Sequence, residues 1–318
     1  MSVWLLTDIA MDAHEAPGHP ERPDRRRAVA DGVRDATGDG LDQRAVEPID
    51  VATLGMIHDP EYLAALEALE ARGGGWLDGD TYLVPGSVRA AMLAAGASLL
   101  AAIAVATGRA EVAFGVVRPP GHHASRARGS GFCLINNVAV AVAGLRTRGL
   151  AERVAIADWD VHHGDGTQAL FDADAGVCYA STHQSPFYPG SGDADEVGSG
   201  DAVGTMHNRP LDAGSGDRAF TRAWLDDLVP AIEEFAPDVI LVSAGFDAHR
   251  ADPLADLNVT EAGFEAVATS IGALSARLGH RGVALTLEGG YDLPALRSST
   301  AAAVRGILDG RGSVTDAR

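Results

Sequence analysis

The chain has 318 residues, 46% of them hydrophobic, and a formal net charge of −19, and it contains arginine but no lysine. Such an acidic balance opposes direct nucleic-acid binding, which depends on cations that neutralise phosphates. It would attract cationic substrates, although a GC-rich genome or a salt-adapted proteome is the simpler explanation of the composition.

Apolar runs of strand length alternate with helical stretches along the whole chain, without a linker rich in Pro, Gly or Ser. This alternation predicts an α/β fold, with a central, mainly parallel sheet flanked by helices in a single domain over residues 1–318. Ser87 and Thr260 are the expected N-caps of two helices. Helices are predicted over residues 24–36, 60–71, 87–107, 137–148, 167–172, 217–235, 260–278 and 293–308.

Three features of the sequence bear on the location of the protein. Residues 90–107 form the longest apolar stretch, but they are rich in alanine and are interrupted by Gly96 and Ser98. A helix buried against the sheet is therefore expected rather than a membrane span. Cys133 and Cys178 lie in apolar, strand-like settings, which favours buried, reduced thiols in a cytoplasmic protein. Residues 1–12 have no basic start, so no secretory signal is expected.

Four apolar runs end in glycine and titratable residues just before a helical stretch. The carboxyl ends of parallel strands meet at one edge of the sheet, so these four endings are expected to build one pocket. The runs cover residues 112–117, 153–157, 238–242 and 282–286, and they lead to His122-His123, Asp158 with its followers, Asp247 and Tyr291.

Residues 158–166 bring three carboxylates and two imidazoles together directly after a predicted strand. Asp160 and His162 are two residues apart, so on an extended backbone both side chains point to the same side. A carboxylate and a neutral imidazole aimed at one point form half of a metal site. The alternative, a polar solvated turn, explains so dense a cluster of titratable groups less well.

These segments and several others resemble metal-dependent deacetylases of the arginase/histone deacetylase superfamily. Within it, the chain is most similar to class II histone deacetylases and bacterial acetylpolyamine amidohydrolases. The matching segments run from near the start of the chain to residue 291. They are residues 19–23 (His-Pro-Glu-Arg-Pro), 118–124, 131–133 with 136–137, 158–167, 187–190, 243–247 with 252–254, and 288–291.

The resemblance implies that Asp160, His162 and Asp247 hold a catalytic metal. One nitrogen and two oxygen donors suit Zn²⁺ and would also accept Fe²⁺ or cobalt. Ureohydrolases of the same fold hold two manganese ions and carry a Ser-x-Asp-x-Asp pattern at the third ligand. Gly245 replaces the first of those acids here, so a mononuclear site is expected.

The adjacent His122 and His123 follow a Pro-Pro-Gly turn. A single loop histidine is usually a bystander, but a pair with carboxylates available favours proton transfer. By resemblance, Asp158 holds the His122 ring and Asp165 the His123 ring. His123 is then the general base and acid, His122 gives electrostatic support, and the Tyr291 phenol donates to the developing oxyanion. The sequence alone does not separate the two histidines.

The resemblance also implies a narrow tunnel to the metal, lined by Gly131, Phe132, Tyr188 and Leu254. Phe132 and Tyr188 would flank the aliphatic stem of an acetyl-lysine. Leu254 stands where polyamine-selective relatives carry an acidic residue, and residues 71–85 lack the long insertion of those relatives. Both points favour acyl-lysine or other neutral acyl amides over polyamines.

A structural K⁺ site is implied as well, formed by Asp158, backbone carbonyls of Asp160 and His162, and Ser181 with Thr182. A strand-end cap is the competing interpretation of these two hydroxyl residues.

Three other residues depart from or extend this pattern. Arg25 is expected to line an internal channel for acetate. His207 and Arg209 stand where relatives usually carry aliphatic residues, and the sequence offers no explanation for them.

The function predicted from the sequence is a zinc-dependent amidohydrolase that removes acetyl or acyl groups from acetyl-lysine side chains or related acetylated amines. An acetylpolyamine amidohydrolase is the alternative, and a catalytically silent binding protein is a weaker one. The expected partner is therefore an acetylated lysine peptide or an acetylated polyamine, without nucleic acid or membrane. The sequence leaves open the native metal, the acyl length and whether the chain forms a homo-oligomer.

Overall fold

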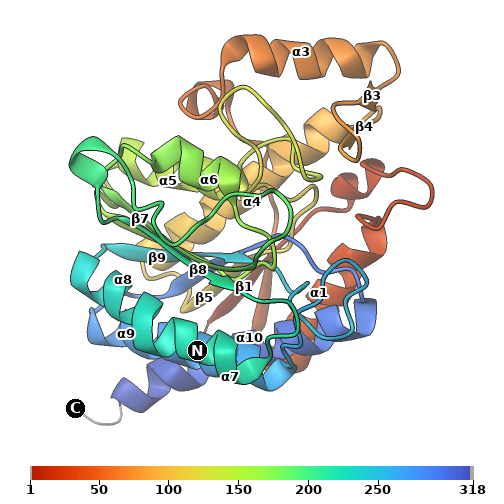
Figure 1. Cartoon of the computed structure of the whole chain (residues 1–318). Helices are drawn as coiled ribbons and strands as arrows, with labels where there is room; N and C mark the ends of the chain where they lie inside the picture. Colours follow the sequence, from red (N-terminus) through yellow and green to blue (C-terminus); the bar gives the residue numbers. More distant parts are fainter. Residues whose placement is uncertain (1, 316–318) are drawn as a thin grey trace.

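The computed structural model describes residues 2–315, which are built around one eight-stranded sheet (Figure 1). Neighbouring strands are parallel throughout, in the order β2-β1-β5-β10-β9-β6-β7-β8. The predicted parallel α/β architecture is thus confirmed. The strands are β1 Val3–Leu6, β2 Leu41–Arg44, β5 Val112–Gly115, β6 Val154–Asp158, β7 Val177–Gln184, β8 Met206–Leu211, β9 Val239–Ala244 and β10 Val283–Leu287, and an antiparallel pair, β3 Gly75–Trp76 with β4 Tyr82–Leu83, lies apart.

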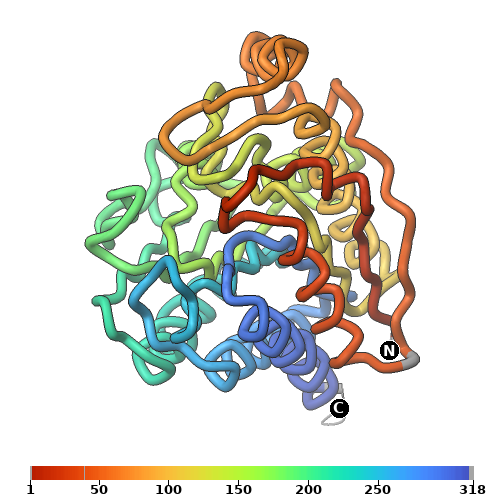
Figure 2. Tube along the Cα trace, turned by 90° about the vertical axis from the view of Figure 1, so that its right-hand side faces the viewer, coloured from red at the N-terminus to blue at the C-terminus, as the bar shows by residue number. Residues whose placement is uncertain are grey.

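Helices cover both faces of the sheet. Figure 1 shows α4, α5 and α6 on one face and α1, α8, α9 and α10 on the other. In Figure 2 the blue C-terminal helix α10 runs beside α1, with which it is in contact. The helices are α1 Pro23–Thr37, α2 Val51–Leu54, α3 Pro60–Ala71, α4 Ser87–Ala106, α5 Asn137–Thr147, α6 Asp165–Phe171, α7 Asp217–Arg222, α8 Val229–Phe235, α9 Glu261–Arg277 and α10 Leu293–Thr315, with short 3₁₀ turns at Ile9–Ala13, Gly38–Gly40 and Gly200–Ala202.

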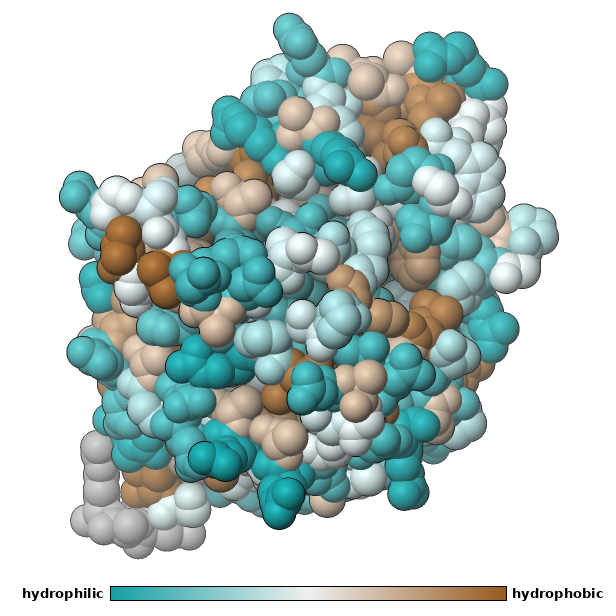
Figure 3. Space-filling model, in the orientation of Figure 1, coloured by the Kyte–Doolittle hydropathy of each residue, from teal (hydrophilic) through white to brown (hydrophobic). Residues whose placement is uncertain are grey.

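Helix α4 is the long apolar helix. By length and composition it is, among residues 2–315, the one helix able to cross a membrane. In the structure it packs on β1, β5, β10 and α5, and most of its side chains are buried. The prediction of a buried helix is confirmed. On the face of the molecule shown in Figure 3, hydrophobic side chains lie in small groups between hydrophilic areas.

The predicted N-caps had different outcomes. The Thr260 hydroxyl accepts from the backbone N–H of Ala262 at 3.3 Å, as a cap does. Ser87 is not a cap, because Gly86 occupies that position. The Ser87 hydroxyl instead accepts from the backbone N–H of Val84 at 2.8 Å and closes the preceding turn.

The single helix predicted over residues 217–235 is divided into three parts. A π-helical turn, Ala223–Leu228, separates α7 from α8. Pro230 has no N–H to donate to the carbonyl four residues earlier, which interrupts the α-helical ladder at this turn. The π turn places the buried Trp224 against the sheet, where its indole N–H donates to Thr182 Oγ1 at 2.9 Å.

The sheet also contains strands that the sequence patterns did not reveal, namely β1, β2 and the edge strand β8. Strand β8 carries the unexplained His207 and Arg209. Arg209 Nε donates to Asp227 Oδ2 at 3.0 Å, so the charge ties the edge strand to the adjacent helical layer. Charged side chains on an edge strand also discourage pairing with other chains. The two cysteines are free and buried, as predicted.

Candidate active site

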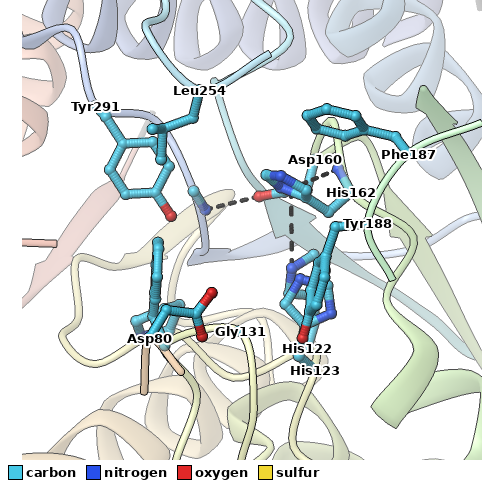
Figure 4. A pocket seen from close by; sticks show the side chains of 13 residues that line it. Asp80, His122, His123, Gly131, Asp160, His162, Phe187, Tyr188, Leu254 and Tyr291 are labelled. Atoms are coloured by element: carbon cyan, nitrogen blue, oxygen red, sulfur yellow. Dashed lines mark hydrogen bonds and ion pairs between the residues drawn. The ribbon is translucent and has the colours of Figure 1, made fainter. Parts of the chain in front are cut away.

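The four strands with polar endings, β5, β10, β9 and β6, are neighbours at the centre of the sheet. Their carboxyl ends open into one cavity of about 250 Å³ (Figure 4). The predicted site residues that line it are His122, His123, Gly131, Phe132, Asp160, His162, Tyr188, Leu254 and Tyr291. Asp158, Asp165 and Asp247 lie directly behind these residues and contact their rings.

Asp160, His162 and Asp247 place one ligand atom each within 4.8 Å of one another. His162 Nδ1 lies 3.1 Å from Asp160 Oδ1 and 3.3 Å from Asp247 Oδ2. Asp247 Oδ2 is buried and has no hydrogen-bond partner among residues 2–315. A buried carboxylate oxygen without a donor is costly unless a cation neutralises it. The three side chains therefore fit a divalent metal ion.

The charges of this triad point the same way. Burial opposes the protonated form of His162, but the adjacent carboxylates of Asp160 and Asp247 raise its pKa to about 10. Burial and the neighbouring Asp160 raise the pKa of Asp247. The two carboxylates thus attract positive charge, which is a proton in the metal-free protein and would be a cation in the loaded one.

Two glycines leave room for the triad. The Gly289 N–H donates to Asp160 Oδ2 at 2.7 Å, and a methyl group at this position would lie 1.9 Å from Asp247 Oδ2. At Gly245 a methyl group would lie 2.0 Å from Asp160 Oδ2. Position 245 is where ureohydrolases carry an additional acid, and this packing leaves no space for one. The expectation of a mononuclear site stays a prediction.

We expect Gly289→Ala to weaken zinc binding by roughly 10- to 100-fold, because the added methyl group would displace both carboxylates. Loss of a contact that orients a metal ligand usually has an effect of this size. Competition with a chromogenic chelator measures the affinity. Gly40→Ala is the matched control, because a methyl group there meets no atom within 4 Å. Equal affinities in both variants would contradict the expectation.

The histidine pair is held by two carboxylates. His122 Nδ1 lies 3.1 Å from Asp158 Oδ2, which also accepts from the Tyr179 hydroxyl, and His123 Nδ1 lies 2.7 Å from Asp165 Oδ1. Burial lowers the pKa of both rings, but for His122 the charges of Asp160 and Asp158 outweigh it and raise the pKa well above the ordinary value. For His123, burial and the nearby His122 lower the pKa to about 4. The environment thus separates two histidines that the sequence could not.

Tyr291 points its hydroxyl into the same space as the Asp160 carboxylate and the two histidine rings (Figure 4). Burial, together with Asp247 and Asp160, raises the pKa of its phenol well above the usual value, despite the opposing charge of Arg25. The Arg25 guanidinium lies 4.7 Å from the centre of the Tyr291 ring and donates to Gly290 O at 2.6 Å. Tyr291 is therefore held as a neutral hydrogen-bond donor.

Asp252 also positions Tyr291, although the sequence motif gave it no role. Its Oδ2 accepts from the Tyr291 N–H at 2.6 Å, and its Oδ1 accepts from the Leu254 N–H at 3.0 Å. One buried carboxylate thus fixes the backbone of Tyr291 and of Leu254, which lies beside the phenol in the cavity wall (Figure 4).

The cavity wall is mainly aromatic. Phe187 stacks on the His162 ring at 5.4 Å, and Tyr188 meets the His123 ring edge-on at 5.1 Å. Phe187 belongs to the matching segment 187–190, but the sequence did not predict that it lines the cavity. Asp80, from the turn between β3 and β4, also lines it. Leu254 itself carries no charge, as the sequence shows, but Asp80 supplies a carboxylate to the cavity wall from another segment. The preference for neutral acyl amides stays a prediction.

Residues 19–307 match the model of the histone deacetylase domain. The chain belongs to this family. A protein of Methanothermobacter thermautotrophicus named "Probable deacetylase" is 43% identical over 312 residues, which are 96% of this chain and 90% of that protein. Among solved structures, the HDA15 HD domain has a TM-score of 0.90 at 37% identity and covers 99% of this chain and 92% of its own. An acetylpolyamine aminohydrolase from Burkholderia pseudomallei has a TM-score of 0.87 at 30% identity and covers 96% and 98%.

Membership in the histone deacetylase family confirms the resemblance seen in the sequence and supports deacetylase activity. The family's acetyl-amide chemistry also agrees with a cavity that combines a cation triad, a pair of histidines and a phenol.

The residues expected around K⁺ in this deacetylase-family chain are only partly brought together. Ser181 lies opposite Asp158 in the β6–β7 register. The Thr182 hydroxyl accepts from Trp224 on the other face of the sheet, since successive strand residues alternate sides. Only its carbonyl is then available to a cation. The K⁺ site stays a prediction, as does the acetate channel at Arg25.

Glu288 is a further buried acid that no sequence pattern singled out for a role. Its Oε2 accepts from the backbone N–H groups of Gly121 and His122 at 2.6 and 3.1 Å, so it holds the histidine loop against β10. Burial raises its pKa to about 7, although the charge of His122 and the Gly121 N–H oppose the rise.

This raised pKa gives a testable pH dependence in the metal-free protein. The pKa of Glu288 is about 7 in the folded state and 4.5 in the unfolded state. Between these pH values the unfolded chain releases the proton while the folded protein keeps it, so the free energy of unfolding falls as the pH rises. Relative to Glu288→Gln, the wild type should lose up to about 3 kcal/mol of unfolding free energy between pH 4.5 and 7. Urea denaturation at several pH values measures the difference. A difference that is constant with pH would contradict the assignment.

Proposed function

We propose that this protein is a zinc-dependent amidohydrolase that removes acetyl groups from acetyl-lysine side chains and related acetylated amines. The observation that carries the proposal is the convergence of the Asp160–His162–Asp247 triad, the His123 ring and the Tyr291 hydroxyl on one aromatic-walled cavity. Membership in the histone deacetylase family supports it.

Asp160, His162 and Asp247 would hold the zinc ion, which polarises an amide carbonyl and lowers the pKa of water. The Asp165 carboxylate accepts from His123 Nδ1, so Nε2 of that ring is left as an acceptor. Because the pKa of His123 is low, the ring is neutral at pH 7 and can take a proton from the attacking water. The charged His122 beside it stabilises the negative charge that develops.

Tyr291 acts on the other side of the substrate. Its neutral phenol donates a hydrogen bond to the carbonyl oxygen as negative charge builds there. Once the tetrahedral carbon has formed, the protonated His123 returns its proton to the leaving amine and the C–N bond breaks. Phe187, Tyr188 and Phe132 surround the acyl-bearing chain and keep bulk water from the reacting atoms.

Acetylpolyamines are the second candidate substrates. The Asp80 carboxylate in the cavity wall favours them, since it could pair with a second ammonium group. The structural likeness to an acetylpolyamine aminohydrolase also supports this alternative.

A kinetic panel distinguishes the candidates. The purified protein is loaded with Zn²⁺, Fe²⁺ or Co²⁺ and given an acetyl-lysine peptide, N-acetylputrescine, N8-acetylspermidine and peptides with longer acyl groups. We expect the highest kcat/KM with zinc and the acetyl-lysine peptide. A higher value for the acetylated polyamines would establish the alternative, and no hydrolysis of any substrate would leave a binding protein.

A further inference from the structure

His163, the second histidine of the 158–166 segment, takes no part in the chemistry described above. Its ring is buried and turned away from the cavity. Nε2 lies 3.0 Å from Gln168 Oε1, and Nδ1 lies 2.9 Å from Ser191 Oγ. The Gln168 amide nitrogen donates to Glu196, so its oxygen accepts from His163 Nε2–H. His163 Nδ1 is then the acceptor for the Ser191 hydroxyl.

A second buried histidine, His183 at the end of β7, lies beside the first with 4.8 Å between ring centres. Its Nε2 lies 2.9 Å from Gly192 O and its Nδ1 lies 3.0 Å from Ser181 Oγ. A carbonyl only accepts, so Nε2 carries the proton and Nδ1 accepts from the serine. The two rings therefore bond consecutive residues, Ser191 and Gly192.

Residues 185–192, here named the wall loop, run from the end of β7 to this histidine pair. Backbone bonds hold the start: Gln184 N–H donates to Val161 O at 2.8 Å, and Ser185 N–H donates to Leu211 O at 2.9 Å. The middle of the loop supplies Phe187 and Tyr188 to the cavity. The end of the loop is held by side chains: His163 and His183 bond Ser191 Oγ and Gly192 O, and Glu196 Oε1 accepts from the Gly192 N–H at 2.9 Å.

The packing at this end is tight. Gly192 has φ +90°, and a methyl group there would lie 2.5 Å from His183 Nε2 and 2.6 Å from His163 Cγ. The two rings thus limit where the backbone of the loop can run. In the middle of the loop, Phe187 is stacked on His162 and Tyr188 is set against His123, so a displaced loop changes the width of the cavity beside the reacting groups (Figure 4).

We propose that His163 and His183 are positioning residues that fix the wall loop, and that through Phe187 and Tyr188 they set which acyl groups the cavity accepts. The selectivity part of this inference rests on the proposed amidohydrolase function. The positioning part concerns only the loop.

The main test is His183→Leu, which removes the donor to Gly192 O, compared with His183→Gln, whose amide nitrogen can replace it. His280→Leu is the matched control, because His280 also bonds a backbone carbonyl, that of Pro237 at 2.7 Å, and lies outside the cavity. Hydrogen–deuterium exchange of residues 185–192 in the metal-free proteins should rise in His183→Leu alone. Unchanged exchange there would overturn the proposal, whether or not the protein is a deacetylase.

Kinetics of the zinc-loaded proteins test the selectivity. In His183→Leu we expect KM for an acetyl-lysine peptide to rise about tenfold with a small change in kcat, and the butyryl-to-acetyl ratio of kcat/KM to rise. His183→Gln should restore both. A fall in kcat that is the same for all acyl groups would overturn the proposal, since it indicates damage to the catalytic groups. An inactive wild-type protein would instead contradict the proposed function.

Ser191→Ala provides a second variant if His183→Leu does not fold. It removes only the hydroxyl that bonds His163, at a half-buried position. We expect the same direction of change in exchange and in acyl selectivity, with a smaller KM effect of about threefold. No change in exchange or selectivity in this folded variant would likewise contradict the role of the histidine pair.

Discussion

Asp247→Ala is expected to abolish zinc binding and to lower kcat/KM for an acetyl-lysine peptide by roughly 10³-fold or more, as loss of the polarising cation removes several kcal/mol of barrier reduction. The side chain is fully buried, its Oδ1 accepts from the Val161 N–H at 2.9 Å, and its Oδ2 faces His162. Among the described residues, no other acidic side chain belongs to this cluster, so none replaces the lost ligand oxygen.

Metal content by mass spectrometry and steady-state kinetics measure the two effects together. Asp212→Ala is the control, because Asp212 is an exposed carboxylate that also follows a strand but lies outside the cavity. If Asp247→Ala keeps one zinc ion per chain and its activity, the assignment of the triad is wrong.

Tyr291→Phe should lower kcat by about 10²- to 10³-fold, the usual effect of removing one donor to a developing oxyanion. KM should change less, because the phenol donates most strongly in the transition state. The ring itself stays packed against Arg25 and Phe132, so folding and zinc content should be preserved.

Tyr62→Phe is the matched control. Its hydroxyl also donates a single hydrogen bond, to Leu134 O at 2.8 Å, and it lies outside the cavity. Full activity of Tyr291→Phe would show that the phenol does not stabilise the oxyanion. A rise in KM with unchanged kcat would give Tyr291 a binding role instead.

The sequence predicted which side chains meet at the cavity, because each of them lies shortly after the end of a central strand. Asp160, His162, Asp247 and Tyr291 lie within a few residues of a strand end, so the parallel sheet alone brings them together. Family resemblance then assigned roles that spacing could not.

The supporting groups could not be predicted in the same way, because their contacts join segments distant in the chain. Glu288 bonds a loop 166 residues away, and Asp80 enters the cavity from a hairpin with two-residue strands. Strand β8 begins in a polar stretch, and the π turn before Pro230 breaks a helix whose pattern is continuous. Local patterns do not determine such features, since tertiary packing selects them.

Each of the four strands that deliver a reacting group, β5, β10, β9 and β6, has a hydrogen-bonded neighbour on both sides. Fraying of the edge strand β2 should therefore leave these strand ends, and the groups that they carry, in place. On heating, activity should consequently be lost together with the cooperative unfolding of the whole molecule. An activity assay should not detect earlier unfolding of that edge strand.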